Sequence, residues 1–207
     1  MRDPYLYDGE TVLKNKLNIH EQEMLDDAEA DYVSLRLREL VQNHIKGNYH
    51  SDHLLKMHEY IFQDLYEWAG EPRVISIYKE EDVLGGMSIE YSDPFDIAGD
   101  LHHVLEDMRD KAWNQMDIDT LTNEFCDSLA ALWKIHPFRE GNTRITVTFC
   151  CQFIEEIGIG INRKLFENNS RYVRTALVAY NAYFLDGGNF VKKEYLRKIV
   201  KDAFFSI

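Results

Sequence analysis

An apolar residue at every third or fourth position is the feature that most constrains this chain, because the spacing recurs over most of the sequence. Apolar residues at this spacing line one face of an α-helix, whereas a half-buried strand shows strict alternation. The segments with the helical pattern are 19–43, 51–68, 93–114, 118–134, 140–157, 167–185 and 190–205. The predicted fold class is therefore mainly α.

Residues 73–91 break the helical pattern. The segment 73–78 alternates and is rich in β-branched residues, Gly85-Gly86 marks a turn, and 87–91 can return as a second strand. A two-stranded hairpin alone is only marginally stable, so it needs helices beneath it or a strand added by a partner. One β-hairpin is therefore expected on the helical core.

Length and charge limit the class of protein. The 207 residues suit one compact domain with a sizeable core. The formal net charge of −13 repels nucleic acid and anionic membranes unless a local basic patch exists. The basic clusters are short and interleaved with acidic or apolar residues, which is typical of solvated helix faces. Neither a nucleic-acid nor a membrane partner is expected.

The cysteines and the hydropathy favour a cytoplasmic protein. The chain has three cysteines, Cys126, Cys150 and Cys151, and no C-x-x-C motif. The odd number and the missing motif argue against a disulfide framework or a structural zinc site. The first ten residues lack the apolar run of a signal peptide. No stretch reaches the roughly 18 apolar residues of a membrane span. A reducing cytosol is the expected compartment.

One stretch, residues 135–144, gathers residues that can bind a phosphate. Pro137 ends the preceding helix at His136, and the next helix begins near Gly141. A helix N-terminus presents unpaired N–H groups and a partial positive charge, and Gly141 lets a bulky anion approach the backbone. Arg144 adds a forked cation that suits phosphate oxygens. The stretch therefore predicts a phosphate-binding site.

Two further residues of this stretch supply chemistry. Glu140 offers a carboxylate, and Mg²⁺ is usually held by one or two carboxylates together with substrate phosphates. His136 titrates near neutral pH and can accept a proton from an attacking hydroxyl. Each residue also has an ordinary structural use, as a helix cap, a solvated acid or part of a turn. Their coincidence at one loop-to-helix junction favours a phosphoryl- or nucleotidyl-transfer site.

The segment 136–147, HPFREGNTRITV, resembles the signature of the Fic (filamentation induced by cAMP) family, His-x-Phe-x-(Asp/Glu)-Gly-Asn-Gly-Arg-x-x-Arg. The stretches DPYLYDGETVLKNKLNI and HEYIFQDLYEWAGEPR are similar to parts of bacterial filamentation-associated Fic proteins. The resemblance implies a helical core with a hairpin flap over the active-site loop. The implied organisation is a single Fic domain over 1–207, with an N-terminal arm 1–18, a core 19–165 that holds the flap (about 73–91) and the motif (136–147), and C-terminal helices 166–207.

The resemblance also implies an enzyme, a protein adenylyltransferase. Such an enzyme transfers AMP from Mg-ATP to a Ser, Thr or Tyr hydroxyl of a target protein, or of itself, and releases pyrophosphate. It assigns His136 as the general base and Glu140 as the Mg²⁺ ligand. Binding of the nucleotide phosphates is assigned to Gly141, Asn142, Thr143 and Arg144. The flap would dock the target as an added strand.

Two positions depart from the family signature. Thr143 replaces a Gly of the anion nest; it still offers an N–H, and its hydroxyl could contact a phosphate. Val147 replaces the second Arg, which in the family holds the γ-phosphate and pairs with the glutamate of an inhibitory helix. The terminal phosphate is therefore expected to be held less well in this chain.

The family's inhibitory element, (Ser/Thr)-x-x-x-Glu-(Gly/Asn), has no good match. After Ser34 the acid comes one place late, at Glu39, and the spacing from Thr120 to Glu124 is followed by Phe125. A slip of one residue turns a helical side chain by about 100°. The chain is expected to lack a built-in brake, which leaves restraint by a small separate antitoxin protein, as in a toxin–antitoxin pair, or no restraint.

Two alternatives to AMP transfer stay open. One is a Fic-scaffold transferase that uses another nucleotide or donates a phosphate; the phosphate-donating branch carries Lys in the nest, and Thr143 disfavours it. The other is a catalytically weakened regulator that only binds a nucleotide, for which Val147 is the best evidence. The sequence leaves the target protein and the oligomeric state open.

Overall fold

The computed structural model describes residues 3–184 and 188–205. Helices make up most of it, and they confirm the predicted mainly α class. The helices are α1 Gln22–Gln42, α2 Ser51–Phe62, α3 Ile97–Asp110, α4 Ile118–Ile135, α5 Asn142–Glu156, α6 Arg163–Asn168, α7 Ser170–Tyr180 and α8 Glu194–Phe205. Two short antiparallel strands follow α7: β1 Tyr183–Phe184 and β2 Gly188–Asn189.

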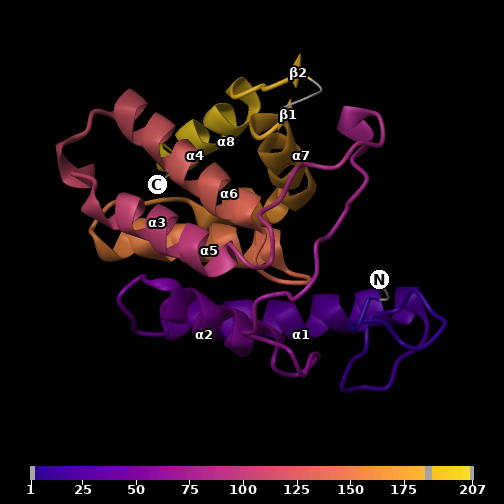
Figure 1. Cartoon of the computed structure of the whole chain (residues 1–207). Coiled ribbons are helices and arrows are strands. Elements are labelled where there is room, and N and C mark those ends of the chain that lie inside the picture. The colour runs from indigo at the N-terminus through magenta and orange to yellow at the C-terminus, as the bar shows by residue number, and fades with distance from the viewer. Residues whose placement is uncertain (1–2, 185–187, 206–207) are drawn as a thin grey trace.

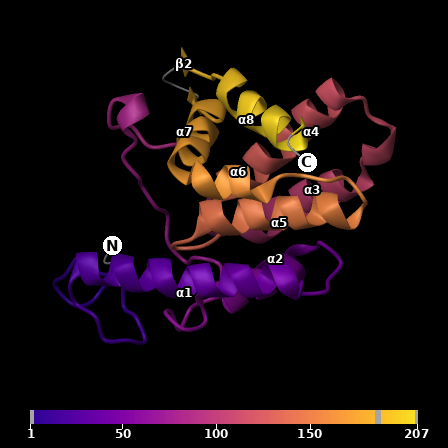
Figure 2. The ribbon, with the colours of Figure 1, turned by 180° about the vertical axis from the view of Figure 1, so that it is seen from behind.

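Helix α4 lies at the centre of the helical core (Figure 1). It packs against α3, α5, α7 and α8, whereas α2 contacts α1, α3 and α5. In Figure 1, α1 and α2 run along the lower side and α4, α7 and α8 lie above them; Figure 2 shows the same two halves from behind. The contacts of α5 with both α2 and α4 join the halves, and the loop between α4 and α5 lies beside this contact.

The buried face of α4 follows the predicted helical spacing. Leu121, Phe125, Leu129 and Leu132 are among its buried side chains and recur at three- to four-residue intervals. Asp117 caps the start of the helix, because its side chain accepts the Thr120 N–H at 2.8 Å. The helix is thus fixed at its start, and its last residue delivers the motif loop to the core.

Two predicted helices have different ends in the structure. Helix α2 ends at Phe62, and the turns that follow bring the rings of Tyr66 and Trp68 into a stack at 4.3 Å. The expected helix 167–185 is divided between α6 and α7 and stops at Tyr180. There the Asn181 amide donates to backbone carbonyl oxygens of α7 and α4 and replaces further helical bonds.

Residues 73–91, called the flap from here on, contain no β-strand in the structure. The flap is an extended excursion from the helical core that ends in a 3₁₀ turn, Asp82–Leu84 (Figure 1). The predicted turn at Gly85-Gly86 is confirmed, since both glycines have positive φ, 65° and 92°. The predicted pairing of two strands is wrong, and the paired strands are instead β1 and β2.

Side chains replace a strand ladder in the flap. Backbone bonds of 3.1 Å from Glu81 N–H to Met87 O and from Gly86 N–H to Glu81 O close only the tip. Below the tip, the Lys79 N–H donates to the Ser88 hydroxyl at 3.1 Å and not to a carbonyl. The hydroxyl therefore occupies the donor that a ladder would use, and regular pairing stops there.

The N-terminal arm lies against the flap base and the motif loop. The Tyr5 ring packs edge-on against Trp68 at 5.4 Å, and the Tyr5 hydroxyl accepts the Val74 N–H at 3.1 Å. Arg139 of the motif loop is paired with Asp3 at 2.9 Å. The arm is therefore part of the structure around the site.

The three cysteines are free and buried, as the sequence indicates. Burial raises the pKa of the Cys151 thiol to about 12, so this thiol stays protonated and unreactive at neutral pH. Within residues 3–184 and 188–205, no helix has the length and apolarity that a bilayer crossing requires.

Candidate active site

Left-handed residues bound the motif loop at both ends. His136 follows the last residue of α4 with a φ of 51°, and its N–H donates back to Trp133 O at 3.1 Å. Gly141 precedes the first residue of α5 with a φ of 81°. These two sharp turns bring the residues between them to the junction of the two helices. The sequence prediction placed this junction correctly.

The imidazole of His136 is held neutral with one nitrogen free. Its Nδ1 lies 3.2 Å from the carbonyl oxygen of Trp133, so Nδ1 carries the proton and Nε2 carries a lone pair. Nε2 is buried and has no hydrogen-bond partner among the described residues. Burial, followed by the charge of Lys79, lowers the pKa of His136 well below its usual value. The free lone pair is the feature that a general base requires.

A flap residue covers His136. The Tyr91 ring stacks on the imidazole with centroids 4.0 Å apart, and the Trp133 ring meets its edge at 5.2 Å. Only 2% of His136 is exposed. The Tyr91 hydroxyl is also buried and without a partner in the described part of the chain. The buried Nε2 is therefore closed to a substrate in this arrangement of the flap.

Glu140 is ionised and fixed by cations and an N–H. Its Oε1 accepts the Gly141 N–H at 2.9 Å, and its Oε2 lies 3.1 Å from the Nζ of Lys79. Burial opposes ionisation, but the Lys79 charge, the Gly141 N–H and Arg144 outweigh it and lower the pKa of Glu140 to about 2. The carboxylate is therefore charged at all physiological pH values.

The first turn of α5 offers backbone donors for an anion. The first helical hydrogen bond runs from Ile145 N–H to Gly141 O at 3.0 Å, so the N–H groups of residues 142–144 lie in front of it. A Cβ on Gly141 would lie only 2.2 Å from the Phe62 ring. Glycine is therefore required here by packing and by positive φ, in addition to any role toward an anion.

Asn142 and Thr143 use their side chains inside the protein. The Asn142 amide accepts the Phe138 N–H at 2.9 Å and donates to the Phe138 O at 2.7 Å, which closes the loop. The Thr143 hydroxyl accepts the Trp133 indole N–H at 2.9 Å. These residues can therefore offer their backbone N–H groups to an anion, whereas the Thr143 hydroxyl oxygen is already engaged.

Arg144 pairs with an acid that sequence reasoning missed. Its guanidinium donates to Glu29 of α1 and lies 3.8 Å from Oε1 of Glu140. Glu29 also accepts the Tyr66 hydroxyl at 2.5 Å. Nothing local distinguishes Glu29 from the other acids of α1, so only the packing of α1 near the motif reveals it.

The two segments considered as a brake are engaged elsewhere. Glu39 accepts hydrogen bonds from Arg36 at 2.9 Å and from Tyr60 at 2.8 Å. Glu124 pairs with Lys111 at 2.9 Å. Both are ordinary helix residues, as the sequence suggested.

Arg73 joins the flap to the motif loop, and sequence reasoning missed this role. Its side chain is buried, and its guanidinium donates to the carbonyl oxygens of His136 at 2.8 Å, Ile75 at 2.6 Å and Ser92 at 2.5 Å. Ile75 and Ser92 lie near the two ends of the flap. One side chain therefore fixes both ends of the flap to the backbone of the motif loop.

His58 of α2 supports the loop from below, and its role was also missed. Its Nδ1 accepts the Gly70 N–H at 2.9 Å, its Nε2 donates to the Glu140 carbonyl at 3.2 Å, and its ring stacks on Phe138 at 3.6 Å. Burial lowers the pKa of His58 to about 3, so the ring is neutral. From the sequence, His58 is recognisable only as part of the buried face of a helix.

The donor set fits a divalent ion that takes further ligands from a nucleotide. Among the described residues, no three His, Cys, Asp or Glu side chains gather at one place. Glu140 is a lone carboxylate, and its Oε2 already attracts a cation, Lys79. Mg²⁺ suits such a site, since it often binds one carboxylate together with phosphate oxygens.

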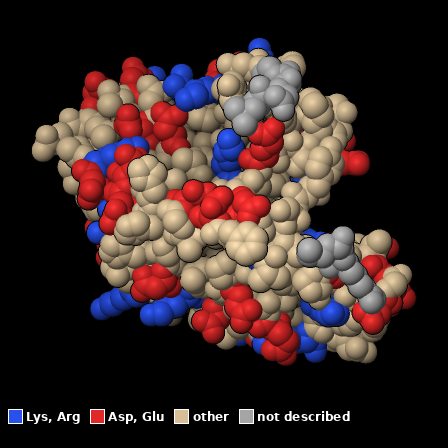
Figure 3. Space-filling view, in the orientation of Figure 1, with Lys and Arg blue, Asp and Glu red and all other residues tan. Residues whose placement is uncertain are grey.

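Charge on the face of the molecule shown in Figure 3 is mixed. Acidic side chains are prominent on the face shown in Figure 3, with basic ones scattered among them. Two basic residues of the C-terminal region are paired with acids of α4: Lys193 with Asp127 at 2.8 Å and Lys201 with Asp119 at 2.5 Å. These pairs neutralise two of the basic side chains near the end of the chain.

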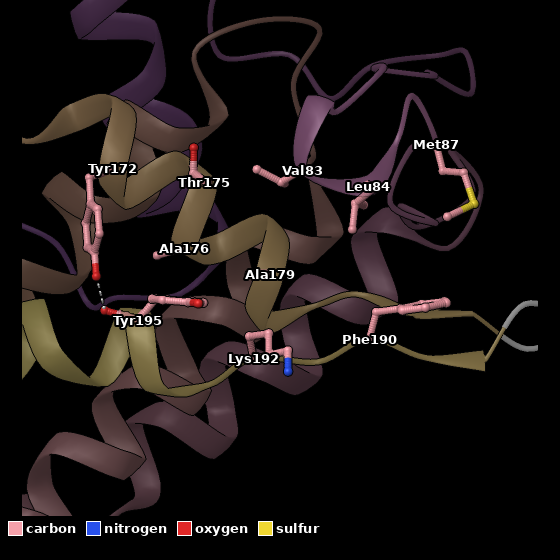
Figure 4. A pocket seen from close by; sticks show the side chains of 10 residues that line it. All are labelled: Val83, Leu84, Met87, Tyr172, Thr175, Ala176, Ala179, Phe190, Lys192 and Tyr195. Atoms are coloured by element: carbon pink, nitrogen blue, oxygen red, sulfur yellow. Dashed lines mark hydrogen bonds between the residues drawn. The ribbon is translucent and has the colours of Figure 1, made fainter.

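An apolar groove of about 570 Å³ lies beside the flap tip (Figure 4). Val83 and Leu84 of the flap form one side, and Thr175 and Ala176 of α7 form another. None of the motif residues lines it. The groove is therefore separate from the motif loop, although the flap borders both.

The chain matches the model of the Fic/DOC family over residues 48–154. It is 30% identical over 160 residues to the protein adenylyltransferase VbhT of Bartonella schoenbuchensis, which covers 77% of this chain and 32% of that protein. It is 29% identical to the probable protein adenylyltransferase y4lH of Sinorhizobium fredii, over 81% of this chain and 83% of that protein. The chain thus spans about a third of VbhT but most of y4lH.

Solved structures share the fold. The BepC protein of Bartonella tribocorum, a VirB-translocated effector with bound AMPPNP, superposes with a TM-score of 0.78 at 20% identity, over 96% of this chain and 95% of that one. A Fic domain from Bartonella quintana with bound ADP gives the same TM-score at 17% identity, over 96% of this chain and 93% of that one. From the family match, the relatives and the motif geometry together, this chain belongs to the Fic/DOC family.

Proposed function

We propose that this chain is a protein adenylyltransferase, which transfers AMP from ATP to a hydroxyl side chain of a target protein and releases pyrophosphate. The observation that carries the proposal is the free Nε2 lone pair of a neutral His136, placed at the same loop-to-helix junction as Glu140 and Arg144. The relatives named protein adenylyltransferase support it.

His136 is the proposed general base. A hydroxyl that attacks the α-phosphorus must lose its proton, and Nε2 is the atom that can accept it while Nδ1 stays bonded to Trp133 O. The lowered pKa keeps this nitrogen unprotonated at neutral pH. The general-base contribution in such reactions is typically about 10²–10⁴ in rate.

The first turn of α5 and Arg144 are proposed to bind the phosphates. The N–H groups of residues 142–144 need no reorganisation to receive an anion. Glu140 would hold Mg²⁺, which supplies charge neutralisation for the phosphates. Arg144 can contribute fully only after its pair with Glu29 loosens.

The flap is proposed to dock the target segment. Its arms are extended but form no ladder with one another in the structure, so backbone N–H and C=O groups are open to a strand from another chain. Strand addition gives affinity through the main chain and places a target hydroxyl near the residue that the flap covers, His136. We propose that the AMP acceptor is a Ser, Thr or Tyr hydroxyl of the target, and that the chain can also modify itself.

The proposal is tested by incubating the protein with Mg²⁺, a bacterial lysate and ATP labelled at either the α- or the γ-phosphorus. Label from the α position alone should enter protein, with an adenylyl mass gain on the modified residue. His136→Ala should lower the labelling by about 10²–10⁴-fold. Label from the γ position would instead identify a phosphate-donating enzyme.

A nucleotide-binding regulator is the second candidate, and a specific observation favours it. Val147 packs partly buried against the core where the family carries its second Arg, and Arg144 is paired with Glu29. Both features reduce the positive charge available to a triphosphate. Tight binding of ADP by the wild-type chain without any labelling of protein would support the regulator and reject the transferase.

A further inference from the structure

Lys79 is the one flap side chain that contacts the Glu140 carboxylate in the described structure. Its Nζ lies 3.1 Å from Oε2, and both side chains are largely withdrawn from solvent, with 22% and 29% of their surface exposed. A charge-assisted bond of this length in a partly dry site is stronger than an exposed surface pair. The contact therefore holds the middle of the flap down on the motif loop.

The ammonium group of Lys79 lies against the Glu140 oxygen that is open to a cation. Oε1 of Glu140 is engaged by the Gly141 N–H, which leaves Oε2 as the oxygen for a further cation. Two cations at one carboxylate oxygen repel each other strongly when water is partly excluded. Lys79 and a divalent ion therefore compete for Oε2.

Displacement of Lys79 would loosen the flap above His136. Lys79 also donates its N–H to Ser88 on the opposite arm, so the two arms move together at this point. Tyr91, which covers His136, lies three residues beyond Ser88. The other side-chain contacts that hold the flap are the pair between Glu81 and Arg174 of α7 at 2.7 Å, near the tip, and the bonds of Arg73 at the base.

We propose that Lys79 is a positioning residue that holds the flap closed by standing in for the metal at Glu140, and that a divalent ion opens the flap by displacing it. The proposal rests on the proposed function for the identity of the ion as Mg²⁺. It adds that metal binding and flap closure exclude each other. Release of Lys79 from Glu140 would then free the flap residues that cover the His136 imidazole.

The first test measures competition directly. Mn²⁺ alone is titrated into the full chain and followed by electron paramagnetic resonance, for the wild type, Lys79→Met and Lys79→Arg. The Glu140→Gln variant gives the background from the other acidic side chains. Lys201→Met is the matched control, because it removes one cation and one ion pair, that with Asp119, away from the site.

Lys79→Met is expected to bind Mn²⁺ at Glu140 about tenfold more tightly than the wild type. In the wild type, Lys79 occupies Glu140 most of the time, and the apparent Mn²⁺ affinity falls in proportion to the fraction of molecules in which Glu140 is free. Lys79→Arg and Lys201→Met should match the wild type. Equal Mn²⁺ affinity of Lys79→Met and the wild type would overturn the proposal.

The second test follows the flap itself by hydrogen exchange of the peptide 79–91. In the wild type, saturating Mn²⁺ should speed exchange of the Glu81 and Gly86 amides, which donate the tip bonds. In Lys79→Met, exchange should be fast from the start and should not respond. A wild-type flap that ignores Mn²⁺ would also overturn the proposal. Neither test requires AMP transfer, so both measurements can be interpreted even if the chain proves not to be an adenylyltransferase.

Discussion

The motif loop and the flap meet over one imidazole but are held in different ways. The loop 136–141 is fixed by buried groups that satisfy each other, such as the Asn142 amide on both polar groups of Phe138. The flap is fixed by a few side-chain contacts, mainly from Arg73, Lys79 and Glu81. A buried network resists change, whereas single contacts can be exchanged for a ligand. The motif loop is therefore expected to be rigid and the flap to be movable.

The largest expected effect is at Gly141, on the rigid side. Gly141→Ala should destabilise the protein by about 3 kcal/mol, because positive φ costs about 1 kcal/mol and the new Cβ collides with Phe62. Gly158→Ala is the matched control, since Gly158 has a similar φ of 90° but open space around it. Urea unfolding of the two variants measures the difference in the free energy of unfolding. Equal losses in the two variants would show that the Phe62 ring moves aside to accept the new Cβ.

A slightly smaller effect is expected at His58. His58→Phe keeps a ring on Phe138 but leaves the Gly70 N–H and the Glu140 carbonyl without their partner. Each unsatisfied buried group costs about 1–3 kcal/mol, so a loss of about 2–3 kcal/mol is expected at pH 7. His102→Phe, at an exposed position of α3, is the control and should change little. A neutral His58→Phe would remove His58 from the support of the loop.

Acid should weaken the same region. The folded pKa of His58 is about 3, below the unfolded value of about 6.5, so the unfolded chain binds the extra proton between these pH values. The contribution is complete above about pH 6.5 and is lost as the pH falls toward 3, at up to about 1.4 kcal/mol per pH unit.

Unfolding free energies at pH 7, 6 and 5 measure this slope. His136 is lowered in the same direction and adds to it. In His58→Phe, the free energy of unfolding should depend less steeply on pH, by the amount that corresponds to about one fewer proton bound on unfolding. A wild-type stability that does not change over this range would contradict the buried neutral assignment.

The smallest effect is expected at the flap tip. Glu81→Gln weakens the two-bond pair with Arg174, and because Arg174 is partly exposed the loss of global stability should stay below about 1 kcal/mol. Exchange of the tip amides should nevertheless rise clearly. A large loss in the free energy of unfolding would mean that the flap is as firmly held as the motif loop.

The helical fold and the motif were predictable because their signals are local. Apolar spacing within each helix identified the mainly α class, and the residues from His136 to Arg144 are contiguous, so one loop must bring them together. The signature also placed Gly141 correctly, although packing against Phe62 is a reason that no sequence pattern contains.

The residues that complete the site were not predictable because they act across long separations. Arg73 is 63 residues from His136, Lys79 is 61 from Glu140, and Glu29 is 115 from Arg144. The failed strand pairing in the flap has the same origin. Ser88 and Lys79 look like ordinary strand residues, and only their contacts show that side chains replace the ladder.

The pair between Asp3 and Arg139 has a practical consequence for anyone who alters the start of the chain. Because the arm is tied to the motif loop, replacing Asp3 would leave the Arg139 guanidinium without its paired carboxylate. A change far from the motif in sequence would then alter the backbone segment that holds His136 and Glu140.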